Sequence, residues 1–220
     1  TGPFRHANDF SAYLSLISLL FLGALAGFAR EITLKKYAMI FIGFFIVVFC
    51  LWQTYSRGAW VAVVLMSFCL AVVVRNRWLN GLLIIFLVWT VFFTPPLIKL
   101  RMASLFEKKG GSVAERVELS NESFRMIRQS PWVGLGVNTY SKNEPLHKQP
   151  GSKLDNQYAH NGYLQMASEI GLLGLGSFLL FLMYFFIQMA KSIRRCRDRL
   201  LKFSLIGLVF GIGAFLIHTS

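Results

Sequence analysis

Tyr158-Ala159-His160-Asn161-Gly162-Tyr163 is the junction at which a long, mostly polar segment ends and an apolar run to Met189 begins. A run of about 20 apolar residues is long enough to cross a bilayer as a helix. Asn161 is a residue that often caps a helix N-terminus, so we expect the helix to start here. His160 would then lie at a membrane surface, where its imidazole can act as a general base. A purely structural histidine is the competing interpretation.

The composition is that of an integral membrane protein. Hydrophobic residues make up 55% of the 220 residues, a balance that is too apolar for an ordinary soluble domain. We therefore predict an all-α, polytopic transmembrane protein. The chain starts without a Met and stops directly after an apolar run, so we expect residues 1–220 to be a fragment of a larger membrane domain. The apolar runs predict spans at 10–28, 37–52, 59–74, 79–94, 162–189 and 203–218.

The net charge of +13 is distributed in a way that indicates orientation. Basic residues follow the first, third and fifth runs, and the positive-inside rule assigns those loops to the cytoplasm. The opposite side, which is periplasmic in a bacterium, then carries the long loop 95–161. No DNA- or RNA-binding motif accompanies the charge, so we do not expect nucleic acid as a partner. The expected partner is the lipid bilayer.

The long loop contains one predicted helix. Ser112-Val113-Ala114-Glu115 fits a capping box, and Ser130-Pro131 should end the helix near Gln129. Pro131-Trp132-Val133-Gly134-Leu135-Gly136 is a glycine-punctuated turn, and 140–157 is predicted to be a polar loop. An amphipathic helix beside this turn could lie on the outer membrane surface. Its mostly apolar face would consist of Val113, Val117, Ser120, Phe124 and Ile127.

Four arginines are candidates for binding an anion. Arg57 stands at the outer end of the third run beside Gly58, and a guanidinium can bind phosphate through two parallel hydrogen bonds. The alternative for Arg57 is a side chain that reaches to lipid headgroups. Arg116 lies near the start of the loop helix, and Arg125 and Arg128 lie near its end. For these three, the alternative is local pairing with glutamates or with the helix dipole.

The helix that follows His160 carries polar side chains along one side. Asn161, Gln165 and Glu169 fall at helical spacing, and Glu169 would lie about 12 Å below Asn161. A carboxylate at that depth is costly unless it is paired or hydrated, so Glu169 and Asn161 are candidate substrate-binding residues. Three further glycines are expected to let a neighbouring helix approach closely. They are Gly171, Gly174 and Gly176.

Patterns typical of metal or nucleotide sites are absent from the sequence. It contains no D-x-D or H-x-x-x-H ligand pattern, and the three cysteines show no ligand spacing. It also lacks a phosphate-binding loop of the form G-x-x-x-x-G-K-[ST]. We therefore expect chemistry without a metal or cofactor, with the driving force carried by the substrate.

Three motifs in this order resemble the O-antigen ligase family. This is the Wzy_C-like membrane domain shared by O-antigen ligases, some O-antigen polymerases and bacterial protein O-oligosaccharyltransferases. The resemblance runs through nearly all of the chain. It rests on Ser56-Arg57-Gly58-Ala59-Trp60, on Glu115-Arg116 through Ser130-Pro131-Trp132-Val133-Gly134-Leu135-Gly136, and on His160-Asn161-Gly162-Tyr163-Leu164 with Glu169-Ile170-Gly171-Leu172-Leu173-Gly174.

The resemblance implies a bacterial inner-membrane glycosyltransferase with its active site on the periplasmic face. The donor would be an undecaprenyl-diphosphate-linked glycan. The acceptor would be lipid A-core in lipopolysaccharide biosynthesis, or another hydroxyl in a polymerase or protein O-oligosaccharyltransferase. The family's two arginines fall on Arg57 and Arg116, and its histidine falls on His160. The arginines would hold the diphosphate, and the histidine would activate the acceptor hydroxyl.

Two functions of other classes stay open. A lipid-linked-sugar flippase or transporter could use the same arginines, but its helices should be polar or broken near the bilayer midplane. The runs 37–52 and 79–94 are almost wholly apolar, which favours chemistry at the surface. The third interpretation is a structural subunit whose basic loop only binds lipid headgroups.

Overall fold

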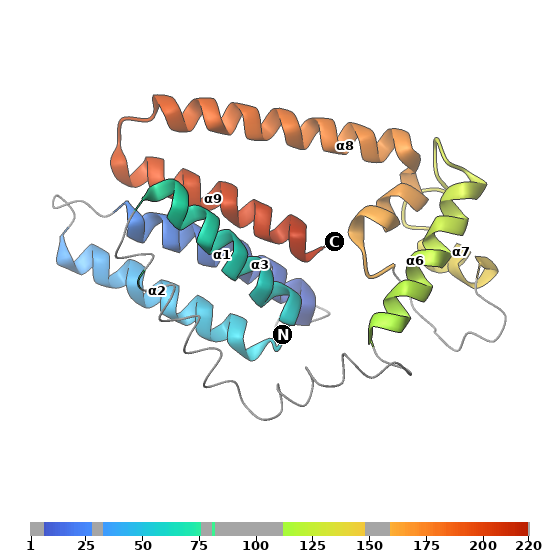
Figure 1. Ribbon diagram of the computed structural model, residues 1–220, viewed down its shortest axis with the longest axis horizontal. Helices are drawn as coiled ribbons and strands as arrows, with labels where there is room; N and C mark the ends of the chain where they lie inside the picture. The colour runs from blue at the N-terminus through green and yellow to red at the C-terminus, as the bar shows by residue number, and fades with distance from the viewer. Residues whose placement is uncertain (1–6, 28–32, 76–80, 82–111, 148–158, 220) are drawn as a thin grey trace. The chain divides into compact units, whose positions relative to one another are not determined.

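The computed structural model describes residues 7–27, 33–75, 81, 112–147 and 159–219, and every regular element in these ranges is a helix (Figure 1). The predicted all-α class is confirmed. The helices form two compact units. The bundle contains α1 (Ala7–Ala26), α2 (Leu34–Gln53), α3 (Arg57–Val74), α9 (Arg199–His218) and the end of α8 (Gly162–Arg195). The loop unit contains α6 (Ser112–Gln129), α7 (Tyr140–His147) and α8 as far as Tyr184.

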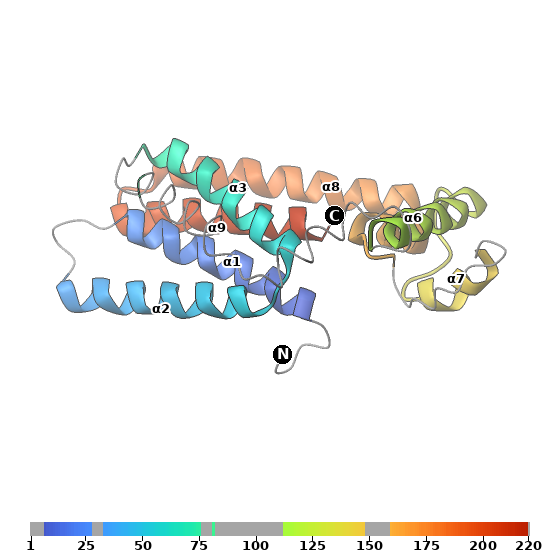
Figure 2. The ribbon, with the colours of Figure 1, turned by 60° about the horizontal axis from the view of Figure 1, so that its bottom comes forward.

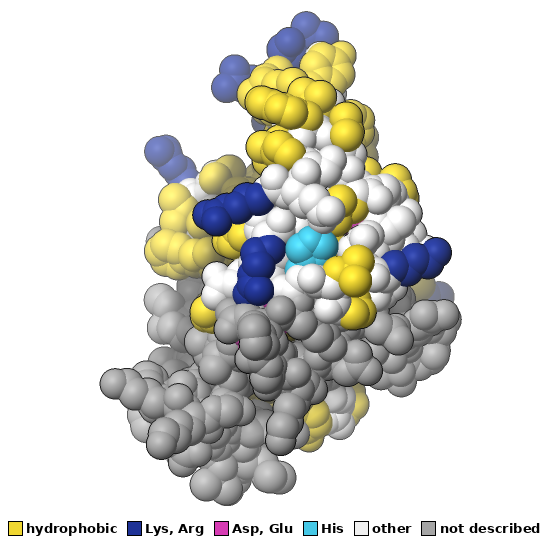
Figure 3. All heavy atoms as spheres, turned by 90° about the vertical axis from the view of Figure 1, so that its right-hand side faces the viewer, with side chains coloured by type: hydrophobic (Ala, Val, Ile, Leu, Met, Phe, Trp, Pro, Cys, Tyr) yellow, Lys and Arg dark blue, Asp and Glu magenta, His cyan; other side chains and the backbone are white. Residues whose placement is uncertain are grey.

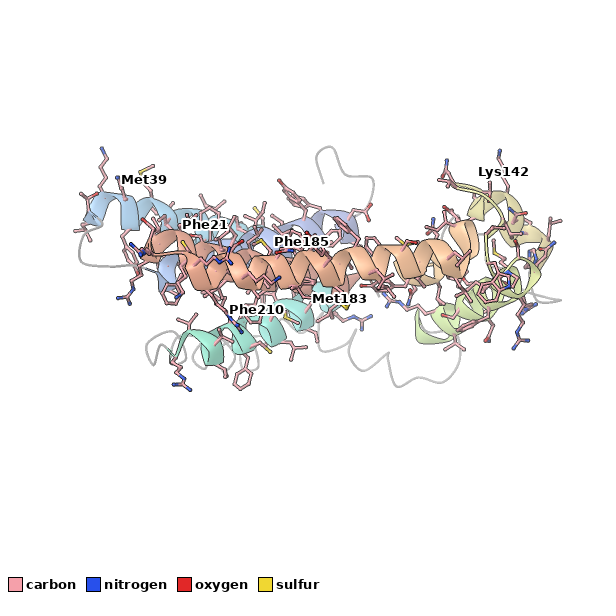
Figure 4. All side chains as sticks on the ribbon, turned by 90° about the horizontal axis from the view of Figure 1, so that it is seen from above. Phe21, Met39, Lys142, Met183, Phe185 and Phe210 are labelled. Atoms are coloured by element: carbon pink, nitrogen blue, oxygen red, sulfur yellow. The ribbon has the colours of Figure 1, made fainter. Side chains whose placement is uncertain are left out.

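Five of the helices, α1, α2, α3, α8 and α9, are long and apolar enough to cross a membrane, as expected for a polytopic protein. They coincide with five of the expected runs, and each starts at the same residue as its run or a few residues before it. The remaining expected span, at 79–94, lies outside the described residues except for residue 81. Met39 on α2 and Met183 on α8 are among the exposed apolar side chains (Figure 4). Such side chains suit contact with lipid.

Small residues bring α1 and α9 into close contact at the centre of the bundle. Figures 1 and 2 show α1 between α2 and α9. A Cβ added to Gly23 would lie 2.7 Å from the Cα of Gly207, and one added to Gly207 would lie 2.9 Å from the Cα of Gly23. Such backbone contact is how helices associate in lipid, where dispersion replaces the hydrophobic effect as the driving force.

Three serines of α1 are also buried: Ser11, Ser15 and Ser18. Each hydroxyl donates to a backbone carbonyl three or four residues earlier, at 2.7, 2.7 and 2.9 Å. The helix therefore satisfies its own buried hydroxyl groups, as a helix within lipid must. Small side chains with satisfied polar groups leave room for the neighbouring backbone.

The helix predicted in the long loop is confirmed, since α6 covers Ser112–Gln129 and stops before Pro131. Two of its expected apolar positions, Val117 and Phe124, are 56% and 50% exposed. The face that α6 buries is a different one, and the sequence analysis did not identify it. It consists of Leu119, Glu122, Ser123 and Met126.

The prediction of a polar loop from residue 140 was wrong, because α7 occupies Tyr140–His147. Two side-chain contacts hold α7 against α6. The Ser123 and Tyr140 hydroxyls are 2.9 Å apart, and His147 Nε2 lies 2.8 Å from Gln129 Oε1. A short, polar helix of this kind has no apolar periodicity of its own, so its stability comes from tertiary contacts.

Gly207→Ala should destabilise the bundle by about 1–3 kcal/mol, because the new methyl group overpacks a backbone contact. The unfolding midpoint in detergent measures this effect. Gly176→Ala on α8 is the matched control, since no heavy atom of the residues that the structure describes lies within 4 Å of the added Cβ. Its higher helix propensity should leave stability unchanged or raise it by up to about 1 kcal/mol. Equal midpoints for the two variants would contradict close α1–α9 packing.

Candidate functional site

His160 is presented at a sharply defined junction. The Oδ1 atom of Asn161 accepts hydrogen bonds from the N–H groups of Tyr163 and Leu164, both at 3.0 Å, so Asn161 caps α8 as expected. His160, directly before the cap, is exposed and has φ of 52°. This left-handed conformation is uncommon outside glycine. The backbone therefore turns at His160 and leaves its imidazole accessible.

A small core beneath His160 fixes this turn. Ala159 is buried together with Met126 of α6 and Tyr140 of α7, and Leu135 and Leu164 pack against them. Side chains from α6, α7, α8 and the turn before α7 pack around Ala159, so the residue before the histidine is held in place. We call this cluster the platform of His160. Sequence reasoning did not single out Tyr140, whose only signal was an aromatic residue in a polar stretch.

Glu169 has a role in this platform. Its carboxylate accepts the N–H groups of Asn138 at 2.8 Å and Tyr140 at 3.3 Å, and also the amide of Gln165 at 3.3 Å. The carboxylate thus sits at the N-terminus of α7, where negative charge is favoured. These hydrogen bonds satisfy the carboxylate within the protein. These contacts give Glu169 a positioning role, while the substrate contact expected from the sequence stays a prediction.

The glycine-containing turn after α6 and the kink of α8 at Gly171 are joined by backbone hydrogen bonds. α8 is interrupted at Gly171, with φ 72° and ψ 179°, so Leu172 and Leu173 do not donate to the helix carbonyls of Ser168 and Glu169. The turn after α6 supplies the missing partners. Leu135 and Gly136 donate to Ser168 and Glu169, both at 2.9 Å, while Leu172 and Leu173 donate to Pro131 and Trp132 at 2.7 and 3.3 Å.

The two backbone segments can approach this closely only because residues 134 and 171 are both glycine. A Cβ on Gly134 would collide with the backbone of Glu169, and a Cβ on Gly171 would collide with the backbone of Trp132. Both glycines also have φ near +70°. The expectation that Gly171 faces a neighbouring helix was wrong, because a turn lies against it. No heavy atom of the described residues lies within 4 Å of a Cβ placed on Gly176, another glycine expected to face a helix.

Arg57 belongs to the bundle, where it is the first residue of α3. The preceding Ser56 is buried, and Trp60 fixes the start of α3 against α2. Its Nε1 donates to the Leu51 carbonyl at 3.2 Å, and its ring stacks on Trp52 at 4.7 Å between centroids. Arg57 is half-buried. A guanidinium at a helix N-terminus combines its own charge with the positive end of the dipole, a setting that suits an anion.

His218, at the end of α9, is a neighbour of this site that the sequence reasoning missed. Its Nε2 lies 3.2 Å from the Asn8 carbonyl and 3.1 Å from the Ser11 hydroxyl. Because a carbonyl can only accept, the contact with Asn8 is a hydrogen bond in the tautomer that carries its proton on Nε2. A Cβ on Gly58 would lie 3.0 Å from His218 Nδ1. His218 thus fits against the glycine next to Arg57, which explains the need for a small residue there.

Arg116 and Arg125 lie on opposite sides of α6. Arg116 and Arg128 are exposed and Arg125 is half-buried. Arg116 and Arg125 are nine residues apart, which places them on opposite sides of a helix with 3.6 residues per turn. Arg116 and Arg125 therefore cannot approach one ligand from the same side of α6. The buried Glu122 lies on a third face, away from Arg116.

Among the residues that the structure describes, no group of three His, Cys, Asp or Glu side chains is arranged to hold a metal. The three cysteines are half-buried thiols on α2 and α3 and in the connection between α8 and α9.

Comparison with protein families identifies what this chain is similar to. A family model described as O-antigen ligase (Wzy_C) matches residues 42–179, which is more than half of the chain. The match includes the start of α3, all of α6 and α7 and the kink in α8. No curated protein matches the sequence.

Glu169→Ala should loosen α7, because two backbone N–H groups lose their acceptor at a cost of about 1–3 kcal/mol. Hydrogen exchange measured by mass spectrometry should show faster exchange for peptides covering 138–143. Gln165→Ala removes only the 3.3 Å side-chain contact and serves as the control. Equal protection of these peptides in the two variants would show that Glu169 does not support α7.

Proposed function

The chain belongs to the O-antigen ligase family, and from this premise we propose that it transfers a glycan from undecaprenyl diphosphate to an acceptor hydroxyl. Members of the family are enzymes of the O-antigen ligase or polymerase type, which implies a lipid-linked glycan and an acceptor as substrates. O-antigen ligation to lipid A-core, on the periplasmic face of the bacterial inner membrane, is the specific assignment that we propose.

The backbone conformation and the exposure of His160 are the observations that support this proposal most strongly. An exposed imidazole in an uncommon backbone conformation, mounted on a packed platform beside a capped helix, suits a group held ready for a reaction. In the proposed step, His160 takes the proton of the acceptor hydroxyl while that oxygen forms a bond to the anomeric carbon. The bond from the anomeric carbon to the diphosphate breaks, and undecaprenyl diphosphate leaves with the electron pair.

Arg57 and Arg116 would bind the diphosphate and offset the charge that develops on it. Arg57 is the stronger candidate, because it stands at a helix N-terminus and its backbone is fixed by Trp60. Arg116, which is exposed on α6, is the second candidate that the family resemblance gives. Arg125 and Arg128 would contribute through longer-range attraction of the anionic donor. Asn161, whose Oδ1 caps α8, would offer its NH₂ group to substrate. The charge stabilisation in this proposal comes from guanidinium groups and needs no metal.

His160→Ala should abolish glycan transfer while donor binding persists, because the variant loses the proton acceptor and keeps the anion site. The measurement is transfer by the full-length protein in detergent, with undecaprenyl-diphosphate-linked glycan, lipid A-core, and reactions with and without chelator. His147→Gln is the matched control and should keep transfer, because a glutamine amide can still hydrogen-bond to Gln129 and His147 is not a candidate site residue.

Several outcomes of this assay would change the assignment. Glycan chain growth or protein labelling in place of transfer to lipid A-core would indicate a polymerase or a protein O-oligosaccharyltransferase. Loss of activity with chelator would refute the metal-free step. An intact wild-type protein that binds donor but transfers to no acceptor would favour a flippase or transporter. Full activity in His160→Ala would refute the role of His160.

Arg57→Lys should impair transfer nearly as much as Arg57→Ala, because an ammonium cannot reproduce the two parallel hydrogen bonds of a guanidinium. The ratio of kcat/KM to that of the wild type measures the loss. Arg75→Lys, at the other end of α3 and exposed, is the control and should be neutral. If Arg57→Lys retained the activity of the wild type, bidentate phosphate binding by Arg57 would be disproved.

A further inference from the structure

The turn between α6 and α7 exposes more apolar surface than a turn in water should. Trp132, Val133 and Val137 are 64%, 70% and 74% exposed. Exposed apolar side chains that are scattered singly are common, but three within six residues indicate a surface that contacts something apolar. None of the three contributes to the small core around Tyr140. These three side chains are called the apolar turn surface below.

The backbone of this turn is fixed to α8 just beyond its kink. The carbonyls of Pro131 and Trp132 accept the N–H groups of Leu172 and Leu173, and both leucines are exposed. The apolar turn surface is therefore attached to the segment of α8 whose side chains are lipid-facing in character. It is not a free loop that could take any position relative to that helix.

The position of Leu172 and Leu173 along α8 gives their depth in the membrane. Residues 170–190 carry no charge, and Glu169 and Lys191 bound this stretch. At 1.5 Å per residue it is about 30 Å long, which matches the hydrocarbon core of a bilayer. Leu172 and Leu173 thus lie at one boundary of the hydrocarbon. Tryptophan is enriched at this boundary, where one part of its ring is apolar and the other polar.

We propose that the apolar turn surface is a membrane contact, with Trp132, Val133 and Val137 inserted among the lipids at the boundary where the uncharged part of α8 begins. Basic side chains flank the turn and would meet lipid phosphates. Arg128 precedes it and Lys142, which projects from α7, follows it; both are exposed (Figure 4). Figure 3 shows apolar and basic side chains side by side on the face that carries α6 and α7.

Accessibility of a spin label to two collision partners tests this proposal. The three native cysteines are replaced by serine, and the label is placed at Val133→Cys, with Val137→Cys as a second position. Both side chains are exposed, so the label should not disturb folding. The full chain is reconstituted in vesicles of phosphatidylethanolamine and phosphatidylglycerol. Oxygen, which concentrates in lipid, is compared with a nickel chelate, which stays in water.

Labels at 133 and 137 should collide readily with oxygen and poorly with the nickel chelate. A label at Ser141→Cys, on the exposed polar side of α7, is the control and should show the reverse. High nickel accessibility at 133 and 137 would place the turn in water and overturn the proposal. Low accessibility to both reagents would show that protein covers the turn, which would equally overturn it.

Discussion

The exchange of hydrogen bonds at Gly171 is the constraint on which the loop unit depends. A break in an apolar helix leaves two carbonyls and two N–H groups without partners, and in lipid each would cost several kcal/mol. The turn from Pro131 to Gly136 replaces both missing hydrogen bonds with four of its own. The turn can do so only because neither backbone segment has a Cβ at the point of contact, where Gly134 and Gly171 lie. The kink and the turn therefore require each other.

The same exchange determines where the candidate base is held. It places Glu169 against the N-terminus of α7, and α7 in turn brings Tyr140 beneath Ala159. These contacts are either hydrogen bonds or packing between buried side chains. We therefore expect the backbone at His160 to have little freedom to move relative to the kink. A reacting group displaced by a fraction of an ångström loses much of its effect. In the proposed mechanism, side chains that never touch substrate therefore contribute to the positioning of the base.

The features that the sequence predicted are those that depend on local patterns. Apolar run length indicated the spans, and the capping box with Pro131 gave both ends of α6. Asn161 was predicted as a helix cap from its place before an apolar run, and its side chain caps α8.

The features that the sequence did not predict depend on contacts between distant segments. α7 has no periodicity of its own, and the kink at Gly171 exists because residues 131–136 supply its partners. The buried face of α6 carries Glu122 and Ser123, so hydrophobic spacing pointed to a different face. Glu169 was recognised as an unusual acid, but its backbone partners lie about 30 residues away. The identity and order of the candidate site residues could be predicted from the sequence. The contacts that hold them in place are visible only in the structure.

The pairing of α1 with α9 has a consequence for how the protein is made. The first described helix of this chain packs against the last, and the glycines that meet, Gly23 and Gly207, are separated by most of the sequence. The ribosome therefore releases α1, α2 and α3 into the bilayer well before α9, which packs against Gly23 of α1, exists. The buried hydroxyls of Ser11, Ser15 and Ser18 donate to carbonyls of α1 itself. These hydroxyls are therefore satisfied in lipid before α9 has been made. The packing of α9 against α1 and α3 therefore forms last, after α1, α2 and α3 can already have met one another.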